Sequence, residues 1–184
     1  MRTRKLVLGA FFAALPVVLS FVPGSIPVAG AKLLPWQHMT NVIVGILLGP
    51  WYAALAATVA AILRNLFGVG TLLAFPGGIP GAFVVGFAYR LWRRDWVALL
   101  EPLGTGPVGA TIGALIVAPA LMDKAIPLGT LMYAFLASSI AGTVVGFLVL
   151  RVLWRLGVVE RLDVLELPPA HRHRSAGAGH AGGH

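Results

Sequence analysis

Polar side chains that could bind a ligand gather at two places in a chain that is otherwise strongly apolar. The first is PWQHMTN, residues 35–41, in which Gln37 and Asn41 are four residues apart and His38 and Asn41 are three apart. A helix that begins here groups these three side chains near its first turn, where they supply hydrogen-bond donors and acceptors. Any one of them also fits a helix cap, and Trp36 fits an interface anchor. Together they favour a binding site.

The second place is RNLFGVGTLLAFPGG, residues 64–78, which opens with a permanently charged side chain. Arg64 shares a helical face with small residues, which let another helix approach closely: Ala53, Ala57, Ala60 and Ala61. We therefore expect Arg64 on the packed side of a bundle, where a charge is costly unless it is paired or solvated. Arg64 either extends to the interface or caps carbonyls of a bent loop, or it lines a ligand cavity.

The glycines that follow Arg64 predict a tight loop rather than a phosphate-binding loop. No GxxxxGK[ST] pattern occurs in the chain, and no lysine follows the glycines. Phe75 within this stretch either stacks on a flat ligand or packs in the apolar core.

The composition of the chain predicts an integral membrane protein. Of the 184 residues, 58% are hydrophobic and only 11% are charged. The net charge of +8 comes from basic residues clustered at the ends of apolar segments, which indicates membrane topology rather than nucleic-acid binding. There is no cysteine, which excludes disulfides and thiolate metal sites.

Six apolar segments, bounded by proline, glycine or charge, predict an all-α bundle of six transmembrane helices. They are residues 6–22, 37–48, 51–67, 78–92, 103–122 and 128–156. The first segment resembles a signal peptide, but without a convincing small-residue cleavage site we expect it to be retained as a helix. The bias of basic residues predicts that both termini are cytoplasmic.

This topology places three loops on the outer face: residues 23–37, 68–76 and 122–127. It also places every acidic residue except Asp123 on the inner side, Glu101 included, so that Asp123 is the expected carboxylate partner if Arg64 has one. The second segment has only about a dozen residues, roughly 18 Å of helix, against an apolar core of roughly 30 Å. The loop before it should therefore dip into the protein, as at transporter sites.

Residues 1–156 are expected to form the membrane domain, and residues 157–184 a polar, disordered tail rich in histidine and glycine. The tail histidines could bind a divalent metal, but their irregular spacing among glycines favours a solvated tail. Catalysis has little support, because no metal-ligand cluster, paired carboxylates or Ser/His/acid set occurs within the spans. We expect no catalytic residue and no metal site.

Taken together, the motifs resemble ThiW, a substrate-binding S component of energy-coupling factor (ECF) transporters. The resemblance covers residues 1–156 and rests on PWQHMTNVIVGILLGPWYA followed by RNLFGVGTLLAFPGGIPGA. It implies a six-helix, multi-pass protein of a prokaryotic plasma membrane that takes up hydroxyethylthiazole, the thiazole precursor of thiamine. The implied substrate-binding residues are Trp36, Gln37, His38, Asn41, Arg64, Asn65, Thr71 and Phe75, with Trp36 or Phe75 stacking on the ring.

The same resemblance implies that the chain itself holds no cofactor. ATP would be used by two cytoplasmic ATPase subunits, which act through a transmembrane coupling subunit. An alanine-x-x-x-alanine pattern on the first helix, matched by Ala10 and Ala14, would dock on that subunit. A phosphorylated ligand for Arg64, or thiamine or its pyrimidine precursor as substrate, remains an alternative. A membrane-embedded enzyme using His38 or Arg64, and a small channel or assembly factor, are the rival classes.

Overall fold

The computed structural model describes residues 2–21, 26–28 and 31–159, which form a bundle of helices with one short β-hairpin. The long helices are α1 (Arg2–Leu19), α2 (Pro35–Leu47), α3 (Pro50–Leu66), α4 (Ala74–Trp92) and α7 (Leu128–Arg155). Between α4 and α7 runs a nearly continuous helical stretch made of η1 (Asp95–Leu100), α5 (Glu101–Leu103), η2 (Gly104–Ala110), η3 (Gly113–Val117) and α6 (Ala118–Leu121). The hairpin strands β1 (Ile26–Val28) and β2 (Ala31–Leu33) pair antiparallel before α2.

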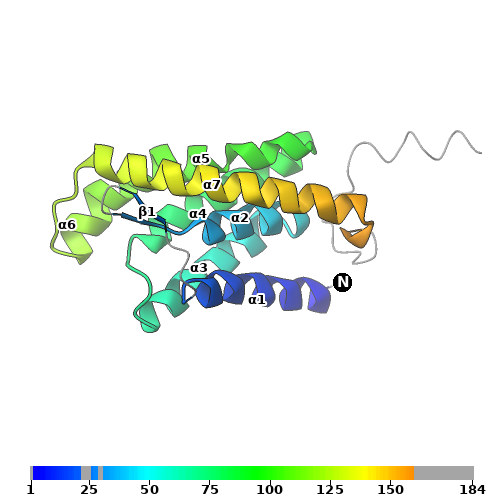
Figure 1. Ribbon diagram of the computed structural model, residues 1–184, viewed down its shortest axis with the longest axis horizontal. Helices are drawn as coiled ribbons and strands as arrows, with labels where there is room; N and C mark the ends of the chain where they lie inside the picture. Colours follow the sequence, from blue (N-terminus) through cyan, green and yellow to red (C-terminus); the bar gives the residue numbers. More distant parts are fainter. Residues whose placement is uncertain (1, 22–25, 29–30, 160–184) are drawn as a thin grey trace, which may run out of the picture.

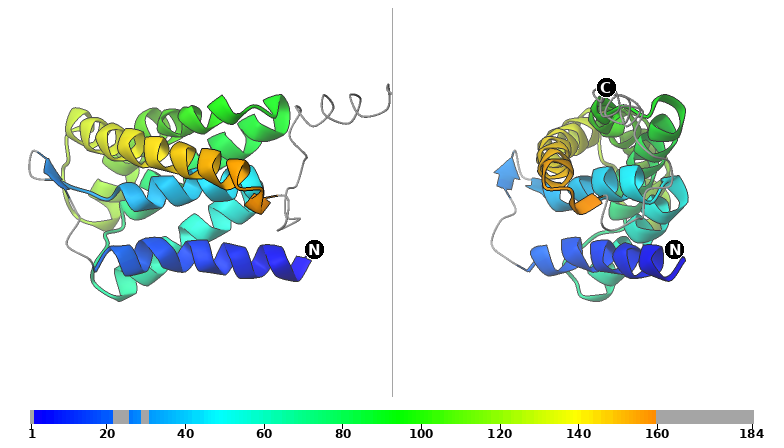
Figure 2. Two further views of the ribbon diagram at one scale, coloured as in Figure 1. Left: turned by 45° about the vertical axis from the view of Figure 1, so that its right-hand side comes forward. Right: turned by 90° about the vertical axis from the view of Figure 1, so that its right-hand side faces the viewer.

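The helices alternate in direction along the long axis of the molecule (Figures 1 and 2). Helix α1 begins and α7 ends at one end of the bundle. The hairpin, the α3–α4 loop and the α6–α7 loop lie at the other end (Figure 1). The prediction that these three connections share one face of the molecule is therefore confirmed.

The six apolar segments predicted from the sequence are mainly helical, and the hairpin is the departure from an all-helical chain. Within the described residues, Asp95–Leu121 and Leu128–Arg155 are each long and apolar enough to cross a membrane. The other long helices do not meet these criteria of length and apolarity by themselves. Helices α2 and α3 have only 13 and 17 residues, and α1 opens with three basic residues. The helical membrane class is confirmed, whereas six crossings remain a prediction.

Helix α2 is the central element of the bundle. It contacts α1, α3, α4 and α7, and all of its residues except Trp36 are buried. Its apolar residues are not confined to one face, as expected for a helix that is surrounded by others. At 1.5 Å per residue α2 is about 20 Å long, so it reaches through only part of the molecule.

Close packing against α7 sets the depth at which α2 begins. A Cβ added to Gly142 of α7 would meet the backbone carbonyl of Pro35, the first residue of α2. Gly142 lies at the middle of α7, so the polar first turn of α2 sits about half-way along the bundle. The space above that turn, toward the hairpin end, is available for a cavity.

The small-residue face predicted on α3 is confirmed. The four alanines and Arg64 are all buried, with exposures of 0–5%. Arg64 therefore lies on the packed side of the helix.

The boundary predicted for the fourth segment is wrong by one turn. Helix α4 begins at Ala74 rather than at Gly78, so the stretch FPGG is helical and not part of the loop. Proline is tolerated in a first turn because the amide that it lacks has no partner there. The predicted tail lies largely outside the described residues, and the division of the chain at residue 156 stays a prediction.

Candidate ligand-binding site

A cavity of about 740 Å³ lies at the hairpin end of the bundle. Its walls come from the first half of α7, the end of α3, the loop after α3 and the start of α4, and its floor from the first turn of α2. The lining residues are Leu34, Gln37, His38, Arg64, Gly68, Val69, Gly70, Thr71, Leu73, Ala74, Gly77, Ile126, Thr130, Leu131, Ala134, Phe135 and Ser138. This volume falls within the range of about 300–1,000 Å³ that is usual for small-molecule sites.

Arg64 and Gln37 form a hydrogen-bonded pair in the cavity wall. The Arg64 Nη1 donates to Gln37 Oε1 at 2.6 Å, and Gln37 Nε2 donates to the carbonyl of Ala74 at 3.3 Å. Gln37 is therefore held by α4 and in turn orients the guanidinium from α3. Within the described part of the chain, Arg64 Nε is buried without a partner.

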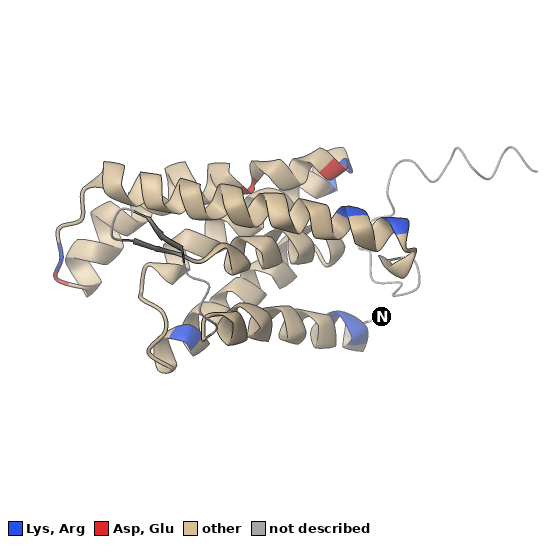
Figure 3. Cartoon of the chain, viewed as in Figure 1, with Lys and Arg blue, Asp and Glu red and all other residues tan. Residues whose placement is uncertain are grey.

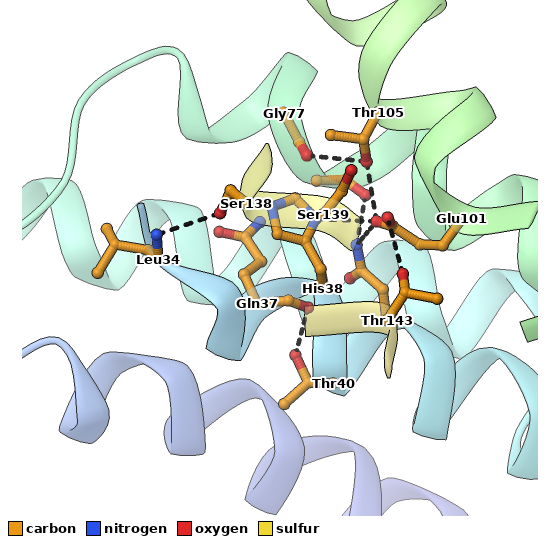
Figure 4. Close-up of polar contacts among 12 residues, drawn as sticks. Leu34, Gln37, His38, Thr40, Gly77, Glu101, Thr105, Ser138, Ser139 and Thr143 are labelled. Atoms are coloured by element: carbon orange, nitrogen blue, oxygen red, sulfur yellow. Dashed lines mark hydrogen bonds and ion pairs between the residues drawn. The ribbon is translucent and has the colours of Figure 1, made fainter. Parts of the chain in front are cut away.

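Behind this wall, Glu101 is the centre of a buried polar network. Its carboxylate is fully buried and its Oε1 accepts hydrogen bonds from His38 Nδ1 at 2.9 Å, Asn41 Nδ2 at 3.1 Å and Thr105 Oγ1 at 2.8 Å. Thr143 Oγ1 lies 3.5 Å from Oε2. Figure 4 shows Glu101 held between His38 of α2, Thr105 of η2 and Thr143 of α7.

The position of Glu101 corrects the prediction that it lies at the inner end of the bundle. Glu101 lies just before the predicted segment 103–122, which begins after Pro102 because proline marks a segment boundary. Instead, the helical stretch begins at Asp95 and carries Glu101 into the core. A run of apolar residues on both sides of a lone carboxylate was the signal that could have revealed it.

Glycines on α4 make room for both polar groups. A Cβ added at Gly78 would collide with the Gln37 amide, and one at Gly81 would collide with the Glu101 carboxylate. Side chains at these positions would push α4 away from α2 and α5. The glycine-rich stretch thus serves close helix packing as well as the loop.

His38 connects the network to the cavity. Its Nδ1 faces the Glu101 carboxylate, and the ring also lines the cavity. A carboxylate at one ring nitrogen favours a proton on that nitrogen and orients the ring. The Nε2 has no hydrogen-bond partner among the described residues and is the ring atom that remains for a ligand.

The predicted substrate-binding residues divide into two groups. Gln37, His38, Arg64 and Thr71 line the cavity. Asn41, Asn65, Trp36 and Phe75 do not.

Three residues of the second group, Asn41, Asn65 and Trp36, have other contacts. Asn41 Nδ2 donates to the carbonyl of Gly78 and to Glu101, so it supports the network. Asn65 Nδ2 donates to the carbonyls of Ala61 and Thr71, which ties the loop to the end of α3. Trp36 packs against the apolar core.

The aromatic residue that lines the cavity is Phe135 of α7, which sequence reasoning did not single out. Ser138, one turn further along α7, also lines it, and its Oγ accepts a hydrogen bond from the Leu34 amide at 3.1 Å. The nine-residue run from Thr130 to Ser138 shows no polar pattern strong enough to mark one face as ligand-facing.

The alanine pattern on α1 is accessible. Ala10 and Ala14 are both exposed on the surface of the bundle, whereas Ala13 between them is buried. Their docking role stays a prediction. Within the described residues no group of three His, Asp or Glu side chains is placed to hold a metal ion.

Comparison with known proteins assigns the chain to a family. A family model for the thiamine-precursor transporter protein (ThiW) matches residues 6–156, which is most of the chain and includes every residue of the cavity. Neither the curated proteins nor the solved structures contain a significant match. With a match of this extent, the chain belongs to the ThiW family of thiamine-precursor transporter proteins.

Proposed function

We propose that this protein captures hydroxyethylthiazole, the thiazole precursor of thiamine, in the cavity beside His38 and Arg64 and delivers it to the cytoplasm. Its family makes it a membrane transport protein with a small-molecule substrate and not an enzyme. The observation that carries the finer assignment is the cavity itself, which combines an apolar ring-binding wall with a few convergent polar groups.

The charge of the cavity supports a precursor over thiamine itself. Arg64 lines the cavity, and no acidic side chain is among the described lining residues. The thiazolium ring of thiamine is a cation, which this wall would repel. A neutral thiazole has no such cost, and Phe135 can contact its flat ring.

We further propose that the chain is an S component with six membrane crossings and both termini in the cytoplasm. Basic residues gather at the end of the bundle where α1 begins and α7 ends (Figure 3), which supports placing that end inside. The cavity then opens toward the outer face. ATP hydrolysis by two partner ATPase subunits, coupled through a transmembrane subunit, would supply the transport energy.

Equilibrium binding to the purified protein in detergent tests the substrate. We expect saturable binding of labelled hydroxyethylthiazole that unlabelled hydroxyethylthiazole displaces, while thiamine and the pyrimidine precursor do not. Displacement by thiamine at equal concentration, or no binding by folded protein, would reject the thiazole assignment.

The docking role is tested with the double variant Ala10→Leu, Ala14→Leu. Bulky residues on the exposed face of α1 should prevent close approach of a coupling subunit, so uptake by cells should be lost while binding in detergent is kept. The matched control is Val144→Leu, Leu148→Phe, which enlarges exposed residues on α7. Normal uptake by the α1 variant, or an equal loss in the control, would contradict docking through α1.

A further inference from the structure

Arg64 is a buried charge whose interactions within the protein are incomplete. Its side chain is only 5% exposed, and its one hydrogen-bond partner among the described residues is the neutral amide oxygen of Gln37. Its Nε is buried without a partner. A guanidinium has five N–H donors and is not neutralised under physiological conditions. Such a group in an apolar bundle needs a further acceptor.

No carboxylate of the described chain supplies that acceptor. The ion pair present in the described residues joins His38 to Glu101, and Glu101 does not line the cavity. Asp123, the partner expected from the sequence, is exposed and forms no ion pair with Arg64. The Glu101 charge is instead occupied by donors from α2, η2 and α7.

A second polar group of the cavity wall, the Ser138 hydroxyl, is also placed to donate. Ser138 Oγ already accepts from the Leu34 amide, so its hydroxyl hydrogen is left to donate to a ligand. His38 lines the same cavity, and its Nδ1 is paired with the Glu101 carboxylate. Arg64, His38 and Ser138 come from three different helices and line one cavity. Arg64 and Ser138 supply donors from two of these helices, and a cationic donor beside a hydroxyl group in one cavity suits an oxyanion.

We propose that the cavity binds its ligand through an acidic oxygen group, a phosphate ester or a carboxylate, held by Arg64. This rests on the proposed function, and it refines the substrate class: the phosphate ester of hydroxyethylthiazole binds more tightly than the alcohol. The guanidinium fork can pair with two oxygens of such a group at once. The heterocycle then lies against Phe135.

Isothermal titration of the purified protein tests this proposal with three ligands. They are hydroxyethylthiazole, its phosphate ester and the corresponding thiazole acetic acid. A separate titration uses inorganic phosphate alone. We expect one or both acids to bind about tenfold or more tightly than the alcohol, since hydrogen bonds to charged groups are stronger than neutral ones. The phosphate and acetate arms tell which acid the site prefers.

Two variants identify the responsible charge. Arg64→Met should reduce the preference for the acids to about onefold, whereas Arg151→Met removes the same charge from an exposed position on α7 and should keep the preference. Melting temperature and gel filtration establish that each variant is folded. Equal or tighter binding of the alcohol by the unaltered protein, or a preference that survives Arg64→Met, would overturn the proposal.

Failure of the proposed function has a different signature. If no thiazole binds, the pyrimidine precursor and its phosphate ester replace the thiazoles in the same titrations. An acid preference that Arg64→Met abolishes then supports the oxyanion site and rejects only the thiazole. A ratio of about one, or no binding of either form, overturns the oxyanion site.

Discussion

Glu101 and Arg64 are both buried ionisable groups in an apolar bundle, but their surroundings differ. The Glu101 carboxylate is contacted by donors from three other elements, whereas Arg64 has one neutral partner and a buried nitrogen without any. A charge whose hydrogen bonds are complete inside the protein stabilises the fold. A charge that is left incomplete beside a cavity is available to a ligand.

The two regions are connected through neighbouring residues of α2. Gln37 bonds to Arg64 and His38 bonds to Glu101, so one helical turn positions both charges. Because Glu101 also bonds to Asn41 in the next turn, its network holds the part of α2 that forms the floor of the cavity. Glu101 is therefore expected to affect binding indirectly, by holding α2 and His38 in position, and Arg64 to affect it directly.

The largest effect should follow Glu101→Ala. Loss of the carboxylate leaves His38 Nδ1 without its acceptor and Asn41 with the Gly78 carbonyl alone, and breaking a buried pair in this way costs about 3–5 kcal/mol. Thermal unfolding in detergent should show a strongly lowered melting temperature. Glu101→Gln keeps the size and one acceptor oxygen and serves as the control, with a smaller loss. An unchanged melting temperature for Glu101→Ala would contradict the view that Glu101 is structural whereas Arg64 serves a ligand.

A moderate loss of ligand affinity is expected for substitution of Phe135 and none for substitution of Phe75. Phe135 lines the cavity and Phe75 does not, so Phe135→Ala should weaken binding of the thiazole about three- to tenfold, as expected for an aromatic contact of about 0.5–1.5 kcal/mol. Phe75→Ala is the matched control and should bind as the unaltered protein does. Titration of both variants checks this, and a larger loss for Phe75→Ala would favour the interpretation made from the sequence.

The smallest effect is expected for the stability of Arg64→Met without ligand. This change leaves the Gln37 oxygen unpaired but removes a buried charge whose partners are incomplete, and a packed apolar side chain can replace such a charge at little cost. The free energy of unfolding should change by less than about 1 kcal/mol. A loss as large as that of Glu101→Ala, in the same detergent, would show that Arg64 is as structural as Glu101.

Local patterns in the sequence were sufficient for the class of the fold. Apolar composition, with proline and glycine as boundaries, predicted the helices, and the spacing of alanines predicted the buried face of α3. The same local reasoning failed where helices started earlier than their prolines suggested. At Glu101 and at the start of α4 the chain continues in helix across or before a proline, because packing against α2 and α7 holds it there.

The sequence by itself determined that Gln37, His38 and Asn41 lie close together at the start of a helix and that Arg64 faces other helices, since spacing along a helix follows from its 3.6-residue period. Only the tertiary structure decided that His38 and Asn41 turn to Glu101, that Gln37 turns to Arg64, and that Phe135 replaces Phe75 at the cavity. The physical reason is that the rotation and depth of each helix are set by contacts with its neighbours. At Gly78, Gly81 and Gly142 those contacts are close approaches between segments distant in the chain, which no local pattern encodes.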